Sequence, residues 1–77
     1  MIRAYVLIQT QVGRAVQVAR EVSKLDGVTS AEAVTGPYDV VAQAEAADLD
    51  QLGRLVAAGI HGVGGISRTI TCAVVAL

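Results

Sequence analysis

The sequence predicts an α+β domain in which a four-stranded antiparallel sheet carries two helices on one of its faces. Four segments have the β-branched and alternating apolar composition of strands. Two segments between them carry apolar residues at helical spacing. The order is strand, helix, strand, strand, helix, strand, and the 77 residues suffice for a single small domain spanning 1–77.

The first strand is expected over Ile2–Thr10, because Tyr5 to Ile8 form a β-branched and aromatic run. Both sets of alternating positions in it are largely apolar, which is typical of a strand covered on both faces. A helical period follows from about Gly13 to Leu25. Gly27 is the natural left-handed residue to end that helix.

Two further strands are expected over Val28–Thr35 and Asp39–Ala46. The residues between them are typical of a tight turn, since Pro37 presets φ and Gly36 tolerates dihedral angles that other residues avoid. The turn therefore predicts a hairpin.

A second helix is expected to begin at Asp48, with Gln51 three residues later completing a capping-box pattern. The glycines of the segment 62–65 end it, and a long last strand is expected over Ile66–Leu77. This repeated β-α-β order predicts a ferredoxin-like βαββαβ fold.

Composition indicates that the domain associates with itself. The chain is 53% hydrophobic and only 17% charged, which is more apolar surface than a small monomer easily hides. A single cysteine excludes an internal disulfide, and a single histidine argues against a metal site. The two helices cover only one face of the sheet, so Tyr5 and Leu7 on the other face would be exposed to solvent. We expect two sheets to pack face to face as a dimeric α/β barrel.

The same composition argues against other partners and cofactors. A formal charge of −1 with six scattered basic residues does not suit a nucleic-acid surface. The apolar segments are too short to span a bilayer as a helix, and the N-terminal segment lacks the features of a signal peptide. We expect a cytoplasmic protein without a cofactor, a metal or catalytic residues.

The segment Val34–Val40 admits two interpretations. In the structural one, Gly36 and Pro37 make the turn while Asp39 accepts hydrogen bonds from nearby backbone N–H groups. In the functional one, the carboxylate of Asp39 holds the ammonium group of an amino acid and Tyr38 walls the pocket.

Polar residues of the last strand and helix are also ambiguous. Thr69 and Thr71 share one strand face, where their hydroxyls could bind a carboxylate or simply favour the strand; Arg68 points to the other face. His61, at a helix end, complements the helix dipole and needs no catalytic role. Cys72 has apolar neighbours and is expected to be buried.

Several segments together resemble a known family. "AYVLIQT", "AVTGPYDVVA" and "DLDQLGRLV" followed by "GISRTITCAVV" are similar, in order and spacing, to the effector-binding (RAM) domain of Lrp/AsnC transcription factors. That resemblance implies a ferredoxin-like, non-enzymatic domain that dimerises through its sheets and forms rings such as octamers. It also implies an amino acid or similar effector bound between dimers. The implied effector-binding residues are Gly36, Tyr38, Asp39, Thr69 and Thr71.

The chain departs from the full-length family pattern, because the first strand follows Met1 at once and no helix-turn-helix precedes it. We expect a stand-alone module that modulates transcription or metabolism by assembling with itself or with longer paralogues. Two alternatives stay open. One is a small dimeric barrel enzyme of the monooxygenase or isomerase type, and the other is a purely architectural partner that binds no small molecule.

Overall fold

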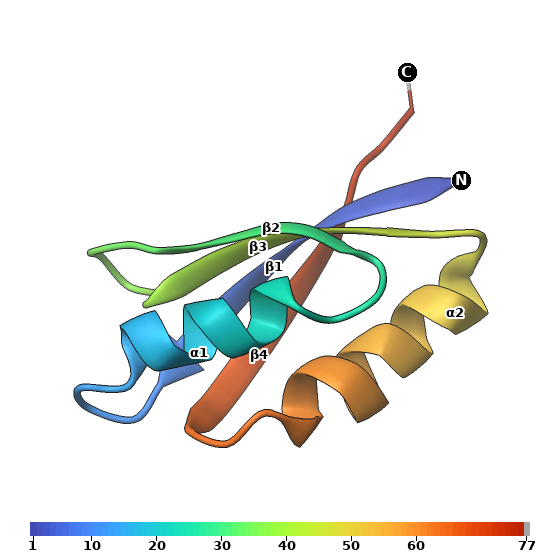
Figure 1. The fold of residues 1–77 in the computed structure, drawn as a ribbon. Coiled ribbons are helices and arrows are strands. Elements are labelled where there is room, and N and C mark those ends of the chain that lie inside the picture. The colour runs from blue at the N-terminus through green and yellow to red at the C-terminus, as the bar shows by residue number, and fades with distance from the viewer. Residues whose placement is uncertain (77) are drawn as a thin grey trace.

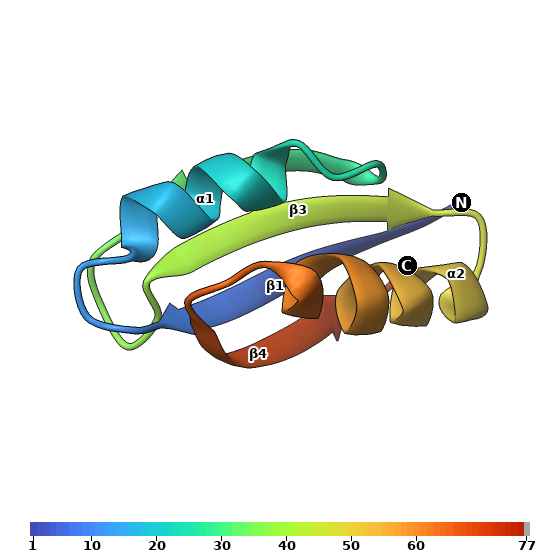
Figure 2. The ribbon, with the colours of Figure 1, turned by 60° about the horizontal axis from the view of Figure 1, so that its bottom comes forward.

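The computed structural model describes residues 1–76 and confirms the ferredoxin-like βαββαβ fold (Figure 1). The elements are β1 (Ile2–Thr10), α1 (Ala15–Ser23), β2 (Val28–Ala33), β3 (Val40–Ala46), α2 (Leu49–Arg54) and β4 (Ile66–Ala73). The strands form one antiparallel sheet in the order β2-β3-β1-β4. The first strand, β1, is therefore flanked by β3 and β4, and within one subunit the helices cover only one of its two apolar faces (Figure 2).

Both helices lie on the same face of the sheet, with α1 over β2 and β3 (Figure 2). The core is the layer between them. Val6 and Ile8 of β1, Val40 of β3 and Val18 and Val22 of α1 are all fully buried there. Because alternate strand residues point to opposite faces, the neighbours of these β1 residues lie on the helix-free side.

The helix α1 is shorter than the period from Gly13 to Leu25 predicts. Gly13 has a φ of 79°, so the left-handed backbone there precedes the helix rather than starting it. At the other end the N–H of Leu25 turns back to the carbonyl of Val22, at 3.1 Å, in a tighter turn. Gly27, with a φ of 94°, reverses the chain as expected.

The helix α2 begins as predicted, since the N–H of Gln51 donates to Asp48 Oδ1 at 2.9 Å. It then continues into a π turn, η1 (Leu55–Gly59), and a 3₁₀ turn, η2 (Ile60–Gly62). In a regular helix Leu52 and Ile60 would point about 80° apart. The additional residue of a π turn brings them back to within about 20° of each other, which allows both to be buried.

Three loops meet at one end of the molecule, opposite the end at which both termini lie (Figure 1). They are the β1–α1 loop, the β2–β3 hairpin and the glycine-rich α2–β4 loop. Gln11 of the first donates its N–H to the carbonyl of Gly65 in the last, at 2.8 Å. Of the expected last strand, β4 ends at Ala73, and Leu77 lies outside the described residues.

Candidate functional site

The β2–β3 hairpin contains the candidate residues Gly36, Tyr38 and Asp39. The N–H of Val34 donates to the carbonyl of Asp39 at 2.8 Å and closes the hairpin. Gly36 has a φ of 143°, a backbone conformation that a side chain disfavours. The turn predicted by the sequence is therefore present and needs this glycine.

Asp39 joins the hairpin to the end of β1. Its N–H donates to the carbonyl of Ile8, and its Oδ2 accepts the N–H of Thr10, both at 2.8 Å. Residues two apart in a strand direct their backbone groups to the same side. The N–H of Thr10 thus points past the beginning of β3, where the Asp39 carboxylate replaces the missing strand partner.

The carboxylate has capacity left for a ligand. A carboxylate offers about four lone-pair sites on its two oxygens, and the Thr10 bond engages one of the oxygens. Asp39 is half-buried, as is Tyr38 beside it. Asp39 therefore makes the backbone contact that the structural interpretation requires, and its carboxylate keeps lone pairs with which it can bind a ligand.

Thr69 and Thr71 lie elsewhere, on β4. They stand opposite Ile8 and Val6 of β1, so they share the helix-facing side of the sheet. The strand β1 separates them from β3 and its hairpin. Two strand spacings amount to about 10 Å. Within one subunit the five predicted residues therefore form two separate sets. The hairpin set is Gly36, Tyr38 and Asp39, and the β4 set is Thr69 and Thr71.

His61 lies beside the β4 set of candidate residues. Its Nε2 lies 2.7 Å from Thr69 Oγ1, within hydrogen-bond distance. From the sequence, this histidine could be placed only at the end of the helix. The path of the glycine-rich loop that follows, which brings Thr69 beneath it, cannot be read from residue spacing. The loop places β4 beneath η2, and the contact follows from that placement.

The helix-free face of the sheet is mainly apolar at its centre. Tyr5 is 41% exposed, and the side chains of Leu7, Val41 and Ile70 share its face. Cys72 stands opposite Tyr5 on this face and is exposed, so the expectation that it is buried within the subunit is wrong. Its apolar neighbours in sequence reflect the composition of a surface rather than of the core.

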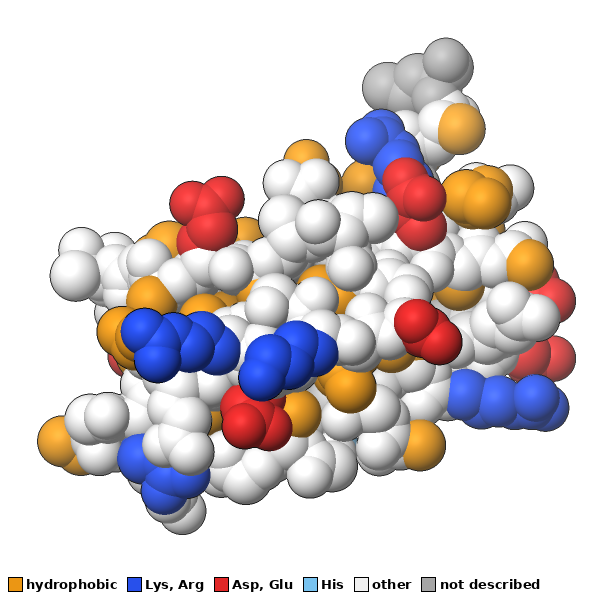
Figure 3. Space-filling model, in the orientation of Figure 1, with side chains coloured by type: hydrophobic (Ala, Val, Ile, Leu, Met, Phe, Trp, Pro, Cys, Tyr) orange, Lys and Arg blue, Asp and Glu red, His pale blue; other side chains and the backbone are white. Residues whose placement is uncertain are grey.

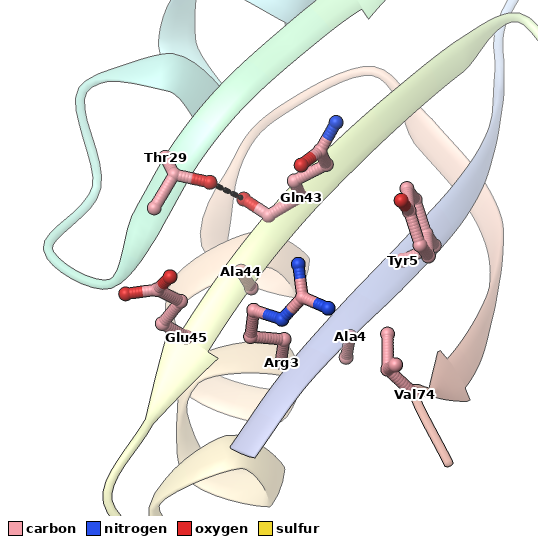
Figure 4. Close-up of a pocket in the computed structure, with 8 residues that line it drawn as sticks. All are labelled: Arg3, Ala4, Tyr5, Thr29, Gln43, Ala44, Glu45 and Val74. Carbon is pink, nitrogen blue, oxygen red and sulfur yellow. Dashed lines mark hydrogen bonds between the residues drawn. The ribbon is translucent and has the colours of Figure 1, made fainter. Parts of the chain in front are cut away.

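Toward the N-terminal end of β1 the same face becomes polar and slightly hollow (Figure 4). The hollow has a volume of about 40 Å³, and Arg3, Tyr5, Gln43 and Glu45 contribute polar side chains to it. Thr29 Oγ1 donates to the Gln43 carbonyl at 3.2 Å. By volume the hollow holds about three water molecules. It lies at the opposite end of β1 from the hairpin.

Charged side chains of both signs are interspersed over the surface shown in Figure 3. Among residues 1–76, no three His, Cys, Asp or Glu side chains are grouped in a way that would hold a metal ion. Within the same range, no helix has the length and apolar character needed to cross a membrane.

Comparison with known proteins identifies the family. Residues 3–76 match the family model of the Lrp/AsnC ligand binding domain. An uncharacterized HTH-type transcriptional regulator of Pyrococcus furiosus is 27% identical over 55 residues, covering 71% of this chain and 37% of the relative. The match thus spans little more than a third of that curated relative's length.

Solved structures agree with this assignment. TTHA0845 from Thermus thermophilus is 34% identical with a TM-score of 0.93, covering 100% of this chain and 96% of that one. The Neisseria meningitidis transcriptional regulator NMB0573, solved in complex with L-Met, has the same fold. It is 22% identical with a TM-score of 0.84, over 97% of this chain and 50% of that one. The chain belongs to the Lrp/AsnC ligand-binding domain family.

Proposed function

We propose that this domain binds an amino acid or a similar small effector and, through its assembly, modulates transcription or metabolism. The observation that carries the proposal is the family match over residues 3–76, since that family is one of ligand-binding domains. The anchored hairpin supports it by holding an aromatic ring and a carboxylate together at one end of the sheet.

The proposed effector contacts are Gly36, Tyr38 and Asp39 of the hairpin with Thr69 and Thr71 of β4. An amino acid carries opposite charges close together, so its site needs an anion for the ammonium group and donors for the carboxylate. Asp39 is the anion, and the threonine hydroxyls are the donors. The complex of the Neisseria regulator with L-Met supports an amino acid as the ligand class.

The site is completed between subunits in this proposal. Within one subunit about 10 Å and the strand β1 separate the two groups of contacts. The ammonium and carboxylate groups of an amino acid are attached to the same carbon atom, so they are too close together to bind both sets of residues across that separation. The hairpin of one subunit and the β4 residues of another, brought together between dimers, meet the requirement.

Assembly is proposed to begin at the helix-free face. An apolar surface on which Tyr5 is exposed and Leu7 and Ile70 are half-buried is typical of an interaction site. A second copy of the chain supplies a surface of the same composition. Two sheets packed in this way form the dimeric barrel, and dimers join into a ring such as an octamer.

The module is proposed to act in the cytoplasm, either as a homo-oligomer or with longer Lrp/AsnC paralogues. The curated relatives that the chain matches are named as HTH-type transcriptional regulators. Contact with longer members of that kind would give an effector-loaded module its regulatory output.

A thermal-shift screen with the twenty amino acids, followed by calorimetry, tests the binding proposal. A ligand present at 100 times its Kd stabilises the native state by about 2.7 kcal/mol. For a domain of this size, that raises Tm by roughly 10 °C or more. No shift with any of the twenty at millimolar concentration would contradict amino-acid binding and favour the architectural alternative.

A further inference from the structure

The contact between His61 and Thr69 joins two segments that the glycine-rich loop brings together. His61 belongs to η2 and Thr69 to β4, and the distance of 2.7 Å between Nε2 and Oγ1 is short for a hydrogen bond. Thr69 is half-buried and His61 is exposed. The imidazole therefore lies on the solvent side of a hydroxyl that we have assigned to the effector.

The position of His61 is fixed by its neighbours. Ile60 is fully buried in the core, and its carbonyl accepts the N–H of Val63 at 3.0 Å. Gly65, with a φ of 96°, then turns the chain into β4, and its carbonyl is held by Gln11 at 2.8 Å. The loop on either side of His61 is thus anchored, which holds the backbone of His61 above the helix-facing side of β4.

We propose that His61 is a positioning residue of the effector site, which sets whether the Thr69 hydroxyl donates to the ligand or only accepts from it. This inference rests on the proposed function, because it assumes that Thr69 contacts the effector. It adds a residue that the sequence pattern did not assign to the site, and it gives that residue a chemical role.

The role follows from the number of hydrogens that the His61 imidazole and the Thr69 hydroxyl can donate. A hydroxyl has one hydrogen to donate and two lone pairs to accept with. For the neutral imidazole we assign the hydrogen to Nδ1, so that the bare Nε2 accepts the Thr69 hydrogen and the hydroxyl is left with lone pairs only. A protonated imidazole donates from Nε2 to Thr69 Oγ1, and the Thr69 hydrogen becomes free to donate outward.

A free hydroxyl hydrogen beside a positive charge suits the carboxylate of an amino acid. The proposal therefore orients the ligand, with its carboxylate at Thr69 and its ammonium group at the hairpin carboxylate of Asp39. It also predicts tighter binding as the pH falls and the imidazole becomes protonated.

The charged groups of the surrounding elements do not include a carboxylate that would compete for the imidazole. The turn η1 and the loop 62–65 contain no ionisable side chain. On β4, Arg68 points to the opposite face, and at the start of α1 the side chain of Arg14 lies against Gly65. α2 ends with Arg54, and its Asp50 lies in the first turn, at the far end of that helix. On β1, Arg3 and Tyr5 lie on the helix-free face.

Calorimetry at about pH 5.5 and about pH 8 tests the inference, using whichever amino acid the thermal-shift screen identifies as the strongest binder. For the wild-type protein, Kd should be about tenfold lower at the acidic pH, the effect of one hydrogen bond to a charged group. His61→Gln replaces the imidazole by an amide, which can still form a hydrogen bond but cannot titrate, and Thr69→Val removes the hydroxyl while keeping the shape. His61→Gln should make the pH dependence flat, and Thr69→Val should reduce it, because the hydroxyl that the imidazole controls is gone. Arg20→Gln, an exposed change on α1, should leave the dependence as in the wild type.

The imidazole can also be followed directly by nuclear magnetic resonance, because the chain has one histidine. By linkage, an effector that prefers the protonated imidazole makes its ring signals titrate at a higher pH when bound than when free. A merely structural histidine would show the same titration in both states.

The outcomes separate this inference from the proposed function. Wild-type binding with a flat pH profile, or the same profile in His61→Gln as in the wild type, overturns the role of His61 and leaves amino-acid binding intact. Binding of none of the amino acids by the wild-type protein overturns both. A pH dependence that His61→Gln abolishes and Thr69→Val reduces, with a ligand-dependent imidazole titration, supports the inference.

Discussion

Asp39 holds the hairpin in place and is also the proposed anchor of the effector's ammonium group, and two substitutions separate these tasks. Asp39→Ala removes both the charge and the acceptor that holds the N–H of Thr10 at 2.8 Å. Asp39→Asn removes the charge but keeps an oxygen of the same reach for that N–H.

The expected magnitudes follow from these contacts. Asp39→Ala leaves the N–H of Thr10 without its partner in a partly buried setting, at a cost of about 1–3 kcal/mol. In a domain of 77 residues this lowers Tm by roughly 5–15 °C. Asp39→Asn should cost about 1 kcal/mol or less, since the hydrogen bond is kept in a neutral form. Both should weaken effector binding by about 10- to 100-fold, through the lost charge-assisted bond to the ammonium group.

Thermal denaturation and calorimetry on the same samples measure both quantities. We expect Asp39→Asn to be nearly as stable as the wild type and still to bind poorly. If Asp39→Asn binds the effector as tightly as the wild type, the carboxylate holds the hairpin alone and is not part of the site. If Asp39→Ala unfolds at the wild-type temperature, the bond to Thr10 contributes little to stability.

The remaining predictions concern the packing beneath α2. Gly27→Ala should destabilise the domain by about 2 kcal/mol or more, because Gly27 has a φ of 94° and a Cβ there would lie 3.0 Å from Leu55 Cδ2 and 3.1 Å from the carbonyl of Glu45. Gly53→Ala is the matched control, since a Cβ at Gly53 meets nothing within 4 Å, and it should stabilise α2 by about 0.5–1 kcal/mol; chemical denaturation that ranked the two changes in reverse would contradict this packing. Ile60→Ala should cost about 2–5 kcal/mol, because Ile60 is fully buried, and a loss below about 1 kcal/mol would show that the π turn does not hold this residue in the core.

Most of the fold is predictable from local signals in the sequence. The capping pair Asp48 and Gln51 marks the start of α2, and Gly27 marks the reversal after α1. The β-branched and aromatic run of Tyr5 to Ile8 marks β1. These signals are encoded within a few residues, so periodicity and turn chemistry suffice to find them.

The features that sequence reasoning missed depend on how distant segments meet. The π turn at Leu55–Gly59 arises because Leu52 and Ile60 both pack into the core, which no regular period shows. Cys72 is exposed since its face of β4 has no helix above it, and the contact of His61 with Thr69 depends on the path of a glycine-rich loop. The site is harder to predict than the fold for the same reason.

The central claim is that a second copy of the chain covers the helix-free face of the sheet, where Tyr5, Leu7, Val41 and Ile70 lie. Sedimentation velocity of the purified protein at micromolar concentration tests it most directly. We predict a dimer or a larger ring at every concentration sampled, and dissociation when Leu7→Glu places a charge in the middle of that face. A single 7.9 kDa species that stays folded in solution would contradict the claim.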